Sequence, residues 1–401
     1  MSFDYSVHKL TGSVQHYSWG GTTFLPRLLN IENPNHAPFA EYWLGVHSGG
    51  PSSIEVNKQP VLLSEVIASD PKAALSAPIF NHFGGLPYLF KVLDVKDMLS
   101  IQVHPTKEYA KVAFEKEEAA GIPLNAPNRN YKDKNHKPEI MLAMSEFWLL
   151  HGFKSEAKII ETLENTAEFQ VLAPLLRAEG LEGLYQFLME MDQAQVDSLL
   201  TPVVKRALRY KQDGKIDKTC PEWWVAKLYD NGAGMLPIDR GVFSIYLFNI
   251  VCIMPGQGIF QEAGVPHAYL EGQNIELMAN SDNVLRGGLT PKHIDIEELL
   301  EHIKFEPTYP NILNGDLKNS NEVQFPCPVP DFGLTKITLS QGEAYTNETN
   351  SFEMFLVMQG EVLLDGIELK AGELAAVKAG STYHIQSIGS ETAVIFKSFV
   401  P

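Results

Sequence analysis

The hydrophobic pattern from residue 1 to about residue 105 consists of short apolar runs separated by turns. Runs such as those beginning at Ser53 and at Leu86 alternate with clusters of Gly, Pro and Asn. This rhythm predicts a β-sandwich or barrel. After Pro105 the chain becomes rich in Lys, Glu and Ala. Because Thr106 is a suitable N-cap, we expect a helix from about Lys107 to Ala120.

The period of the pattern changes between about residues 154 and 230. Apolar residues recur there at helical spacing, as at Leu181, Leu184 and Leu188. This spacing predicts a helical insertion in the β-rich chain. From Gly241 a long apolar run leads to a turn at Pro255 and Gly256, so we expect strands to resume at Gly241.

A weak internal repeat follows. Gly256 and Gly264 precede His267, and Gly372 and Gly380 precede His384, and the glycines of each pair are eight positions apart. The repeat is typical of a hairpin whose turns need glycine backbones and whose second strand begins near a histidine, as in a double-stranded β-helix. Two such barrels are the simplest explanation of the pattern.

Composition narrows the class of protein. The chain has 401 residues, of which 44% are hydrophobic, enough for a full core in two or three domains. Its net charge of −17 opposes binding to nucleic acid or to anionic membranes, so neither is an expected partner. A phosphorylated substrate would need a local basic cluster. No signal-peptide or membrane-span pattern is seen, and we expect a cytoplasmic protein. Cys220, Cys252 and Cys327 fit neither a disulfide framework nor a thiolate zinc site.

Four side chains are candidate metal ligands. Gln102 and His104 alternate on a predicted strand and so point to one face. Glu139 opens an apolar strand, where a carboxylate is costly unless it is paired or bound to metal. His267 follows a proline-containing turn. Together they form a nitrogen and oxygen set suited to zinc, with room for water or a substrate oxygen. For Gln102 and His104 alone, the alternative is a half-buried strand with two hydrogen-bonded polar residues.

Candidate cations lie near these ligands in the sequence. Arg286 stands four residues after Asp282, and the two would form a local salt bridge if this segment were helical. Alternatively, Arg286 projects into a pocket and holds an anion or a developing oxyanion. Lys91, Lys137 and Lys132 would complete a basic cluster, although each alone is more often a solvated surface cation.

Six motifs in this order resemble type I mannose-6-phosphate isomerases. They are Gln15-His-Tyr-Ser-Trp19-Gly20, Glu41-Tyr-Trp43-Leu-Gly45-Val-His47, Pro87-Tyr-Leu-Phe-Lys91-Val-Leu93, Ser100-Ile-Gln-Val-His-Pro105, Tyr131-Lys-Asp-Lys-Asn-His-Lys-Pro-Glu139 and Met278-Ala-Asn-Ser-Asp-Asn-Val-Leu-Arg286-Gly-Gly-Leu-Thr290. The similarity extends from about residue 10 to the C-terminus, while the helical segment and residues 305–340 are less distinctive.

The resemblance implies a mainly β fold with an α-helical insertion: two cupin (jelly-roll) barrels plus a helical domain. The expected domains are a discontinuous catalytic cupin at 1–153 and 235–324, a helical domain at 154–234 and a C-terminal cupin-like barrel at 325–401. The C-terminal barrel has His384 at its repeated turn. It lacks a histidine in the run after Gly360, where the first barrel's metal strand would need one, so we expect it to be metal-free.

The resemblance also implies one Zn²⁺ per chain, held by Gln102, His104, Glu139 and His267, and interconversion of mannose 6-phosphate and fructose 6-phosphate through an enediolate. The expected catalytic residues are Arg286, Lys137, His136 and Asp282, and the expected substrate-binding residues are Lys91, Ser100, Tyr269 and Arg286. The base remains open among His104, His136, Lys137, Asp282 and a zinc-bound hydroxide. The partner is a small phosphosugar, and a monomer is expected, with a dimer left open.

Two other functions compete with this one. Cupins with histidine and carboxylate ligands also hold Fe(II) for oxygen chemistry, and dependence on dioxygen would distinguish that class. A cupin sugar sensor or storage protein would bind a ligand without turnover. The glutamine ligand and the basic cluster favour isomerisation of a phosphosugar.

Overall fold

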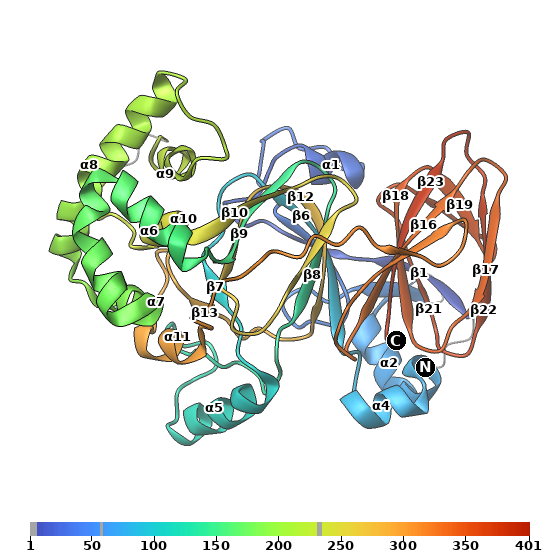
Figure 1. The fold of residues 1–401 in the computed structure, drawn as a ribbon. Coiled ribbons are helices and arrows are strands. Elements are labelled where there is room, and N and C mark those ends of the chain that lie inside the picture. The colour runs from blue at the N-terminus through green and yellow to red at the C-terminus, as the bar shows by residue number, and fades with distance from the viewer. Residues whose placement is uncertain (1–5, 57–58, 231–234) are drawn as a thin grey trace.

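The computed structural model describes residues 6–56, 59–230 and 235–401, which form two β-rich bodies and a group of helices (Figure 1). The first body lies in the middle, the second contains the C-terminal strands, and the helices between residues 156 and 247 cover the opposite end of the first body. No helix among these residues is long and apolar enough to cross a membrane.

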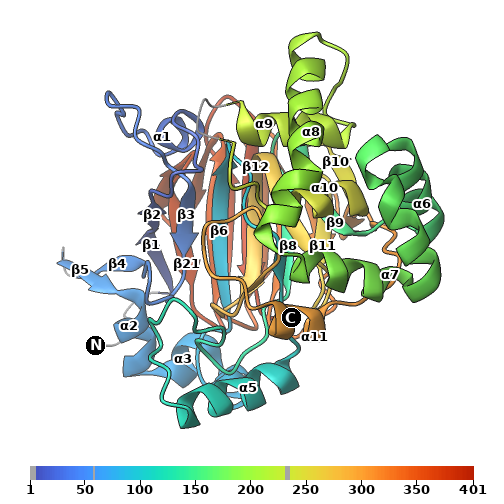
Figure 2. The same ribbon diagram turned by 90° about the vertical axis from the view of Figure 1, so that its left-hand side faces the viewer.

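The first body is built around the long strand β12 (His267–Ala279), which pairs with β6 (Tyr88–Val95), β7 (Gln102–Val103), β8 (Glu139–Ala143) and β9 (Phe147–Phe153). Figure 2 shows β12 and β6 side by side. The remaining strands are β2 (Ser13–Gln15), β3 (Glu41–Leu44), β10 (Phe248–Ile253), β11 (Gly258–Gln261) and β13 (Leu285–Arg286). Strands that are distant in the sequence therefore pair along β12, and β7 and β9 meet its first residue, His267.

The second body contains two sheets. One runs in the order β14 (Asp316–Leu317), β15 (Glu322–Phe325), β16 (Gly333–Leu339), β23 (Ala393–Phe399), β18 (Glu353–Gln359), β21 (Leu374–Val377), β1 (Val7–Thr11), β4 (Ser53–Val56) and β5 (Gln59–Leu62). The other runs in the order β17 (Ala344–Glu348), β22 (Thr382–Ser387), β19 (Glu361–Leu364) and β20 (Ile367–Lys370).

The N-terminal strands differ from the expected domain boundaries. β1 pairs with β21 and with β4, so β1, β4 and β5 extend the sheet of the second body rather than that of the first. Leu10 and Ile54 are buried in a core that both bodies share, together with Phe90 of β6 and Phe396 of β23. Burial of apolar surface across this boundary joins the two bodies. The alternation of the N-terminal strands was visible in the sequence, but their partner sheet was not.

The helices are α1 (Phe24–Leu28), α2 (Leu63–Ser69), α3 (Pro71–Leu75), α4 (Ala77–Phe83), α5 (Lys107–Ala119), α6 (Glu156–Asn165), the 3-10 helix η1 (Ala167–Leu172), α7 (Ala173–Glu190), α8 (Gln193–Gln212), α9 (Pro221–Tyr229), α10 (Gly241–Leu247) and α11 (Ile296–His302). The prediction for α5 is confirmed, and the Thr106 side chain accepts a hydrogen bond from the Tyr109 amide at 3.3 Å. The helical insertion is confirmed by α6 to α9. The short helices α1 to α4 were not predicted.

The prediction of strands from Gly241 was wrong for the first half of that run. Residues Gly241–Leu247 form α10, and only Phe248–Ile253 form a strand. Every residue of α10 is buried, and a fully buried helix carries no polar face that would reveal its period.

The internal repeat has the predicted backbone. Gly256, Gly264, Gly372 and Gly380 all adopt positive φ angles, of 87°, 82°, 85° and 70°, a region that glycine enters without steric cost. The two histidines of the repeat differ in environment. His267 is buried, whereas His384 is exposed and its Nδ1 lies 2.7 Å from Oγ1 of Thr346.

Candidate metal centre

Strand pairing brings the four predicted ligands to one region. His267, the first residue of β12, lies directly opposite Gln102 of β7. Glu139 is the first residue of β8, which pairs with the far end of β12 at Met278. His104 follows β7 directly, and its carbonyl accepts a hydrogen bond from the Gly264 amide at 3.0 Å. The positive φ of Gly264 thus fixes the turn before His267 against the backbone of His104.

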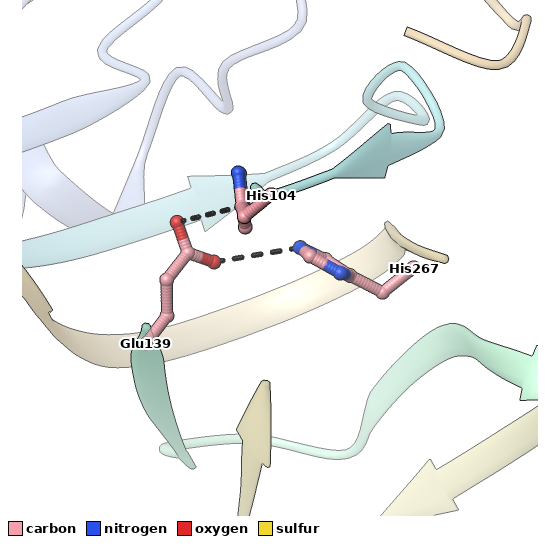
Figure 3. A group of neighbouring side chains, drawn as sticks. All are labelled: His104, Glu139 and His267. Carbon is pink, nitrogen blue, oxygen red and sulfur yellow. Dashed lines mark ion pairs between the residues drawn. The ribbon is translucent and has the colours of Figure 1, made fainter. Parts of the chain in front are cut away.

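The Glu139 carboxylate lies between the two imidazoles (Figure 3). Its Oε1 is 3.5 Å from Nε2 of His104, and its Oε2 is 3.5 Å from Nε2 of His267. All three side chains are buried, and one ligand atom of each lies within 4.8 Å of the others. The geometry therefore places two nitrogens and a carboxylate around one point.

The protonation of this cluster fits a bound cation. Nδ1 of His104 is 3.1 Å from the Asn283 carbonyl, and Nδ1 of His267 is 3.0 Å from the Val265 carbonyl. Because a carbonyl only accepts, each Nδ1 carries the hydrogen, and in a neutral ring Nε2 presents a lone pair to Glu139. Burial lowers the pKa of His104 to about 4, so this ring is neutral at pH 7.

Glu139 is ionised in this setting. Burial acts to raise the pKa of its carboxyl, but the positive charge of the neighbouring Lys137 ammonium opposes burial, and the pKa lies well below the usual range. A carboxylate and two imidazole lone pairs that face one another are mutually repulsive without a cation. Nitrogen and oxygen donors in this number suit zinc, with further positions left for Gln102 and for water or substrate.

A cavity of about 80 Å³ opens beside these residues. Its polar lining is Glu41, Lys91, Gln102, Lys137, Glu139, His267, Tyr269 and Glu276. Lys137 Nζ lies 3.1 Å from Oε1 of Glu139. Lys91 and Lys137 are both less than 10% exposed. This burial excludes the alternative that these two lysines are solvated surface cations.

Glu276 and Glu41 are members of the cavity that the sequence analysis missed. Lys91 Nζ lies 3.0 Å from Oε1 of Glu276 and 3.6 Å from Oε2 of Glu41, and the Tyr269 hydroxyl donates to Oε2 of Glu276 at 2.7 Å. Burial raises the pKa of Glu276, while Lys91 opposes the rise. The signal that identified Glu139, an acidic residue in an apolar strand, was equally present at Glu276.

Arg286 and Asp282 do not form the local salt bridge considered above. The segment is extended rather than helical, and Asp282 lies 3.2 Å from Nε2 of His47. Arg286 in β13 is opposite Gln102 and half-buried, and burial lowers its guanidinium pKa. Burial also lowers the pKa of Lys292, and the positive charges of Arg286 and Lys132 lower it further. Lys292 therefore lies near both Arg286 and Lys132.

The other predicted residues lie outside the cavity. His136 is turned toward Asp331, with Nε2 3.1 Å from each carboxylate oxygen. Asp282 is exposed, and Ser100 is half-buried; neither lines the cavity beside Glu139. A larger cavity of about 450 Å³ lies near His151 and Lys304, but none of the four predicted ligands lines it, so the candidate chemistry is in the smaller one.

Comparison with known proteins agrees with this geometry. Residues 7–156 match the family model of the type I phosphomannose isomerase catalytic domain. Mannose-6-phosphate isomerase of Escherichia coli (strain K12) is 39% identical over 385 residues, which cover 94% of this chain and 96% of that protein. The chain belongs to the type I phosphomannose isomerase family.

More distant relatives and solved structures of this family extend the similarity. The Homo sapiens mannose-6-phosphate isomerase is 32% identical, with 98% of each chain covered. A crystal structure of the Salmonella typhimurium enzyme bound to substrate (fructose 6-phosphate) and zinc matches with a TM-score of 0.86 and 36% identity, over 99% of this chain and 100% of that one. The two-cupin fold with a helical region, expected from the sequence, is therefore confirmed.

Proposed function

We infer that this protein is a zinc-dependent isomerase that interconverts mannose 6-phosphate and fructose 6-phosphate. The observation that carries the inference is the buried cluster of His104, Glu139 and His267, in which three lone-pair donors face one point beside buried lysines. A relative with this fold has been solved with fructose 6-phosphate and zinc. We propose that one zinc ion per chain is held by these three residues and by Gln102.

Within this site the residues of the chain have separate tasks. Zinc, when bound, would act as a Lewis acid that stabilises negative charge on the sugar oxygens during isomerisation. The Asn283 and Val265 carbonyls fix the two histidine rings with Nε2 toward Glu139. The Lys137 ammonium adds positive charge 3.1 Å from Glu139, and we propose that it helps to stabilise the enediolate.

We propose that Arg286, with Lys132 and Lys292, binds the phosphate group. No carboxylate forms an ion pair with Arg286 in the part of the chain that the structure describes, and the positive charges of Arg286 and Lys132 both repel the ammonium of Lys292. A dianionic phosphate would relieve this repulsion and accept a bidentate pair of hydrogen bonds from the guanidinium. The cluster also supplies the local positive charge that an anionic substrate needs on a chain of net charge −17.

We propose Glu276 as the group that carries the proton between C1 and C2 of the sugar. It lines the cavity, and burial raises its pKa, which makes its carboxylate more basic. Tyr269 and Lys91 hold its two oxygens. His136 is paired with Asp331 and Asp282 with His47, and neither these two residues nor Ser100 lines the cavity, so we assign none of the three a direct role.

The Glu276→Gln variant is expected to keep its zinc and to lose about 100-fold to 10,000-fold in turnover, because the amide cannot accept the proton. In the wild type, kcat/KM should fall as the pH decreases through the raised pKa of Glu276, since protonation removes the base. The variant should lose this acid limb of the pH profile. Glu41→Gln is a matched control, because Glu41 also contacts Lys91 but should leave the limb in place. Wild-type turnover in Glu276→Gln would exclude Glu276 as the proton carrier.

We propose that the domain division stays as expected for residues 154–234 and 325–401, with β1, β4, β5, β14 and β15 added to the second barrel. The proposed metal site is complete within one chain, and a monomer is the proposed state. The cytoplasmic location remains a prediction.

Conversion of mannose 6-phosphate by the purified protein tests the proposed function. Zinc-dependent formation of fructose 6-phosphate would support it. A zinc-loaded protein that binds phosphosugars without turnover would favour the sensor, and activity that requires dioxygen would favour the iron oxygenase.

A further inference from the structure

The segment from Tyr131 to Pro138, here called the ligand loop, leads directly into the metal centre. Pro138 precedes Glu139, and Lys137 places its ammonium 3.1 Å from that carboxylate. The neighbouring side chain of His136 points elsewhere, toward Asp331. Adjacent residues of one loop thus contact the metal centre and a residue outside it.

Asp331 belongs to the second barrel. It lies between β15 and β16, next to Phe332, which is buried in the core that both barrels share. The Asp331 carboxylate is fully buried, and both of its oxygens lie 3.1 Å from Nε2 of His136. Within residues 6–56, 59–230 and 235–401, His136 is its one ion-pair partner. A buried carboxylate with a single cationic or hydrogen-bonding partner holds that partner firmly, because separating them leaves an unpaired charge.

The opposite side of the ligand loop is held by the catalytic barrel. Asp133 accepts hydrogen bonds from the Ser281 hydroxyl at 2.9 Å and from the Asp282 amide at 2.8 Å. The Asn283 side chain donates to the carbonyls of Asp133 and Asn135 at 2.8 and 2.9 Å. These contacts fix the first half of the loop. The contact between His136 and Asp331 fixes the second half, which carries Lys137.

We propose that Asp331 is a positioning residue through which the second barrel holds Lys137 against the metal centre. Asp331 fixes the His136 ring, and the ring fixes the backbone from which Lys137 extends toward Glu139. The second barrel thereby contributes to catalysis without lining the cavity. This inference rests on the proposed function, because it assigns Lys137 a part in the reaction.

The test compares Asp331→Ala, Asp331→Asn and Glu353→Gln. Glu353 is the matched control, since it is a buried carboxylate of the same barrel that touches no residue of the ligand loop. Asp331→Ala should lower kcat about 100-fold at temperatures well below its melting point, because a displacement of about 1 Å at a reacting group has an effect of this size. KM and zinc content should change little. Asp331→Asn can still accept one hydrogen bond, so its kcat should fall less than that of Asp331→Ala. Glu353→Gln should keep the wild-type kcat even if its melting temperature is lower.

A second comparison separates positioning from general destabilisation. If Asp331 acts through Lys137, the Asp331→Ala change should lower kcat little further in a Lys137→Met background. An equal further loss in that background would overturn the proposal, as would a wild-type kcat in Asp331→Asn and Asp331→Ala. If Asp331→Ala does not fold, the kcat of Asp331→Asn alone decides whether the proposal stands. Failure of the proposed function is recognised separately, because the wild-type protein would then not convert mannose 6-phosphate at all.

Discussion

The His267→Ala variant is expected to lose both zinc and turnover while its fold remains largely intact. His267 supplies one of the lone pairs that face Glu139, and its ring is held by the Val265 carbonyl. Losing a Lewis acid removes several kcal/mol of transition-state stabilisation, so turnover should fall by about 1,000-fold or more, since each 1.4 kcal/mol is about tenfold. Zinc analysis and a coupled isomerase assay measure the two effects, and circular dichroism checks the fold.

His384→Ala provides the matched control for this variant. His384 occupies the corresponding position of the repeat in the second barrel but is exposed and contacts Thr346. Its replacement should change neither zinc content nor turnover. A His267→Ala protein that kept full zinc and full turnover would remove His267 from the metal centre.

The Arg286→Lys variant is expected to keep its zinc and to lose about 100-fold in kcat/KM, or about 2.7 kcal/mol. A lysine ammonium keeps the charge but cannot form the paired hydrogen bonds of a guanidinium to phosphate. Most of the loss should appear as a higher KM, and inhibition by inorganic phosphate should weaken in parallel. Steady-state kinetics with mannose 6-phosphate measure both.

Two other outcomes for Arg286→Lys have distinct meanings. Wild-type kinetics would place Arg286 outside the substrate site. A loss of kcat at unchanged KM would move Arg286 from the phosphate to the enediolate, because an interaction made only in the transition state affects kcat and kcat/KM equally.

Much of the fold could be predicted because the spacing of apolar residues along the chain indicates which segments are strands and which are helices. The cap at Thr106 and the glycines of the repeat carry the geometry of their own turns. The partner of β1 could not be predicted, since strand alternation is the same whichever sheet the strand joins. The helix at Gly241–Leu247 was not predicted for a related reason, because a segment that is buried on all sides has no polar face that would show a helical period.

The candidate metal ligands could be proposed from the sequence because a buried carboxylate or imidazole in an apolar strand is unfavourable unless it has a partner. The same reasoning applied to Glu276 would have found it. The roles of His136 and Asp282 could not be predicted, because they depend on contacts with Asp331 and His47, which are distant in the sequence. Sequence motifs place a residue in a loop, but the direction of its side chain is decided by tertiary packing.

The central claim is tested most directly by measuring conversion of mannose 6-phosphate to fructose 6-phosphate before chelation, after chelation and after zinc is restored. We predict that turnover is lost when the metal is removed and returns as about one zinc ion per chain is bound again. Turnover that survives complete removal of metal, or a zinc-loaded protein that forms no fructose 6-phosphate, would contradict the account.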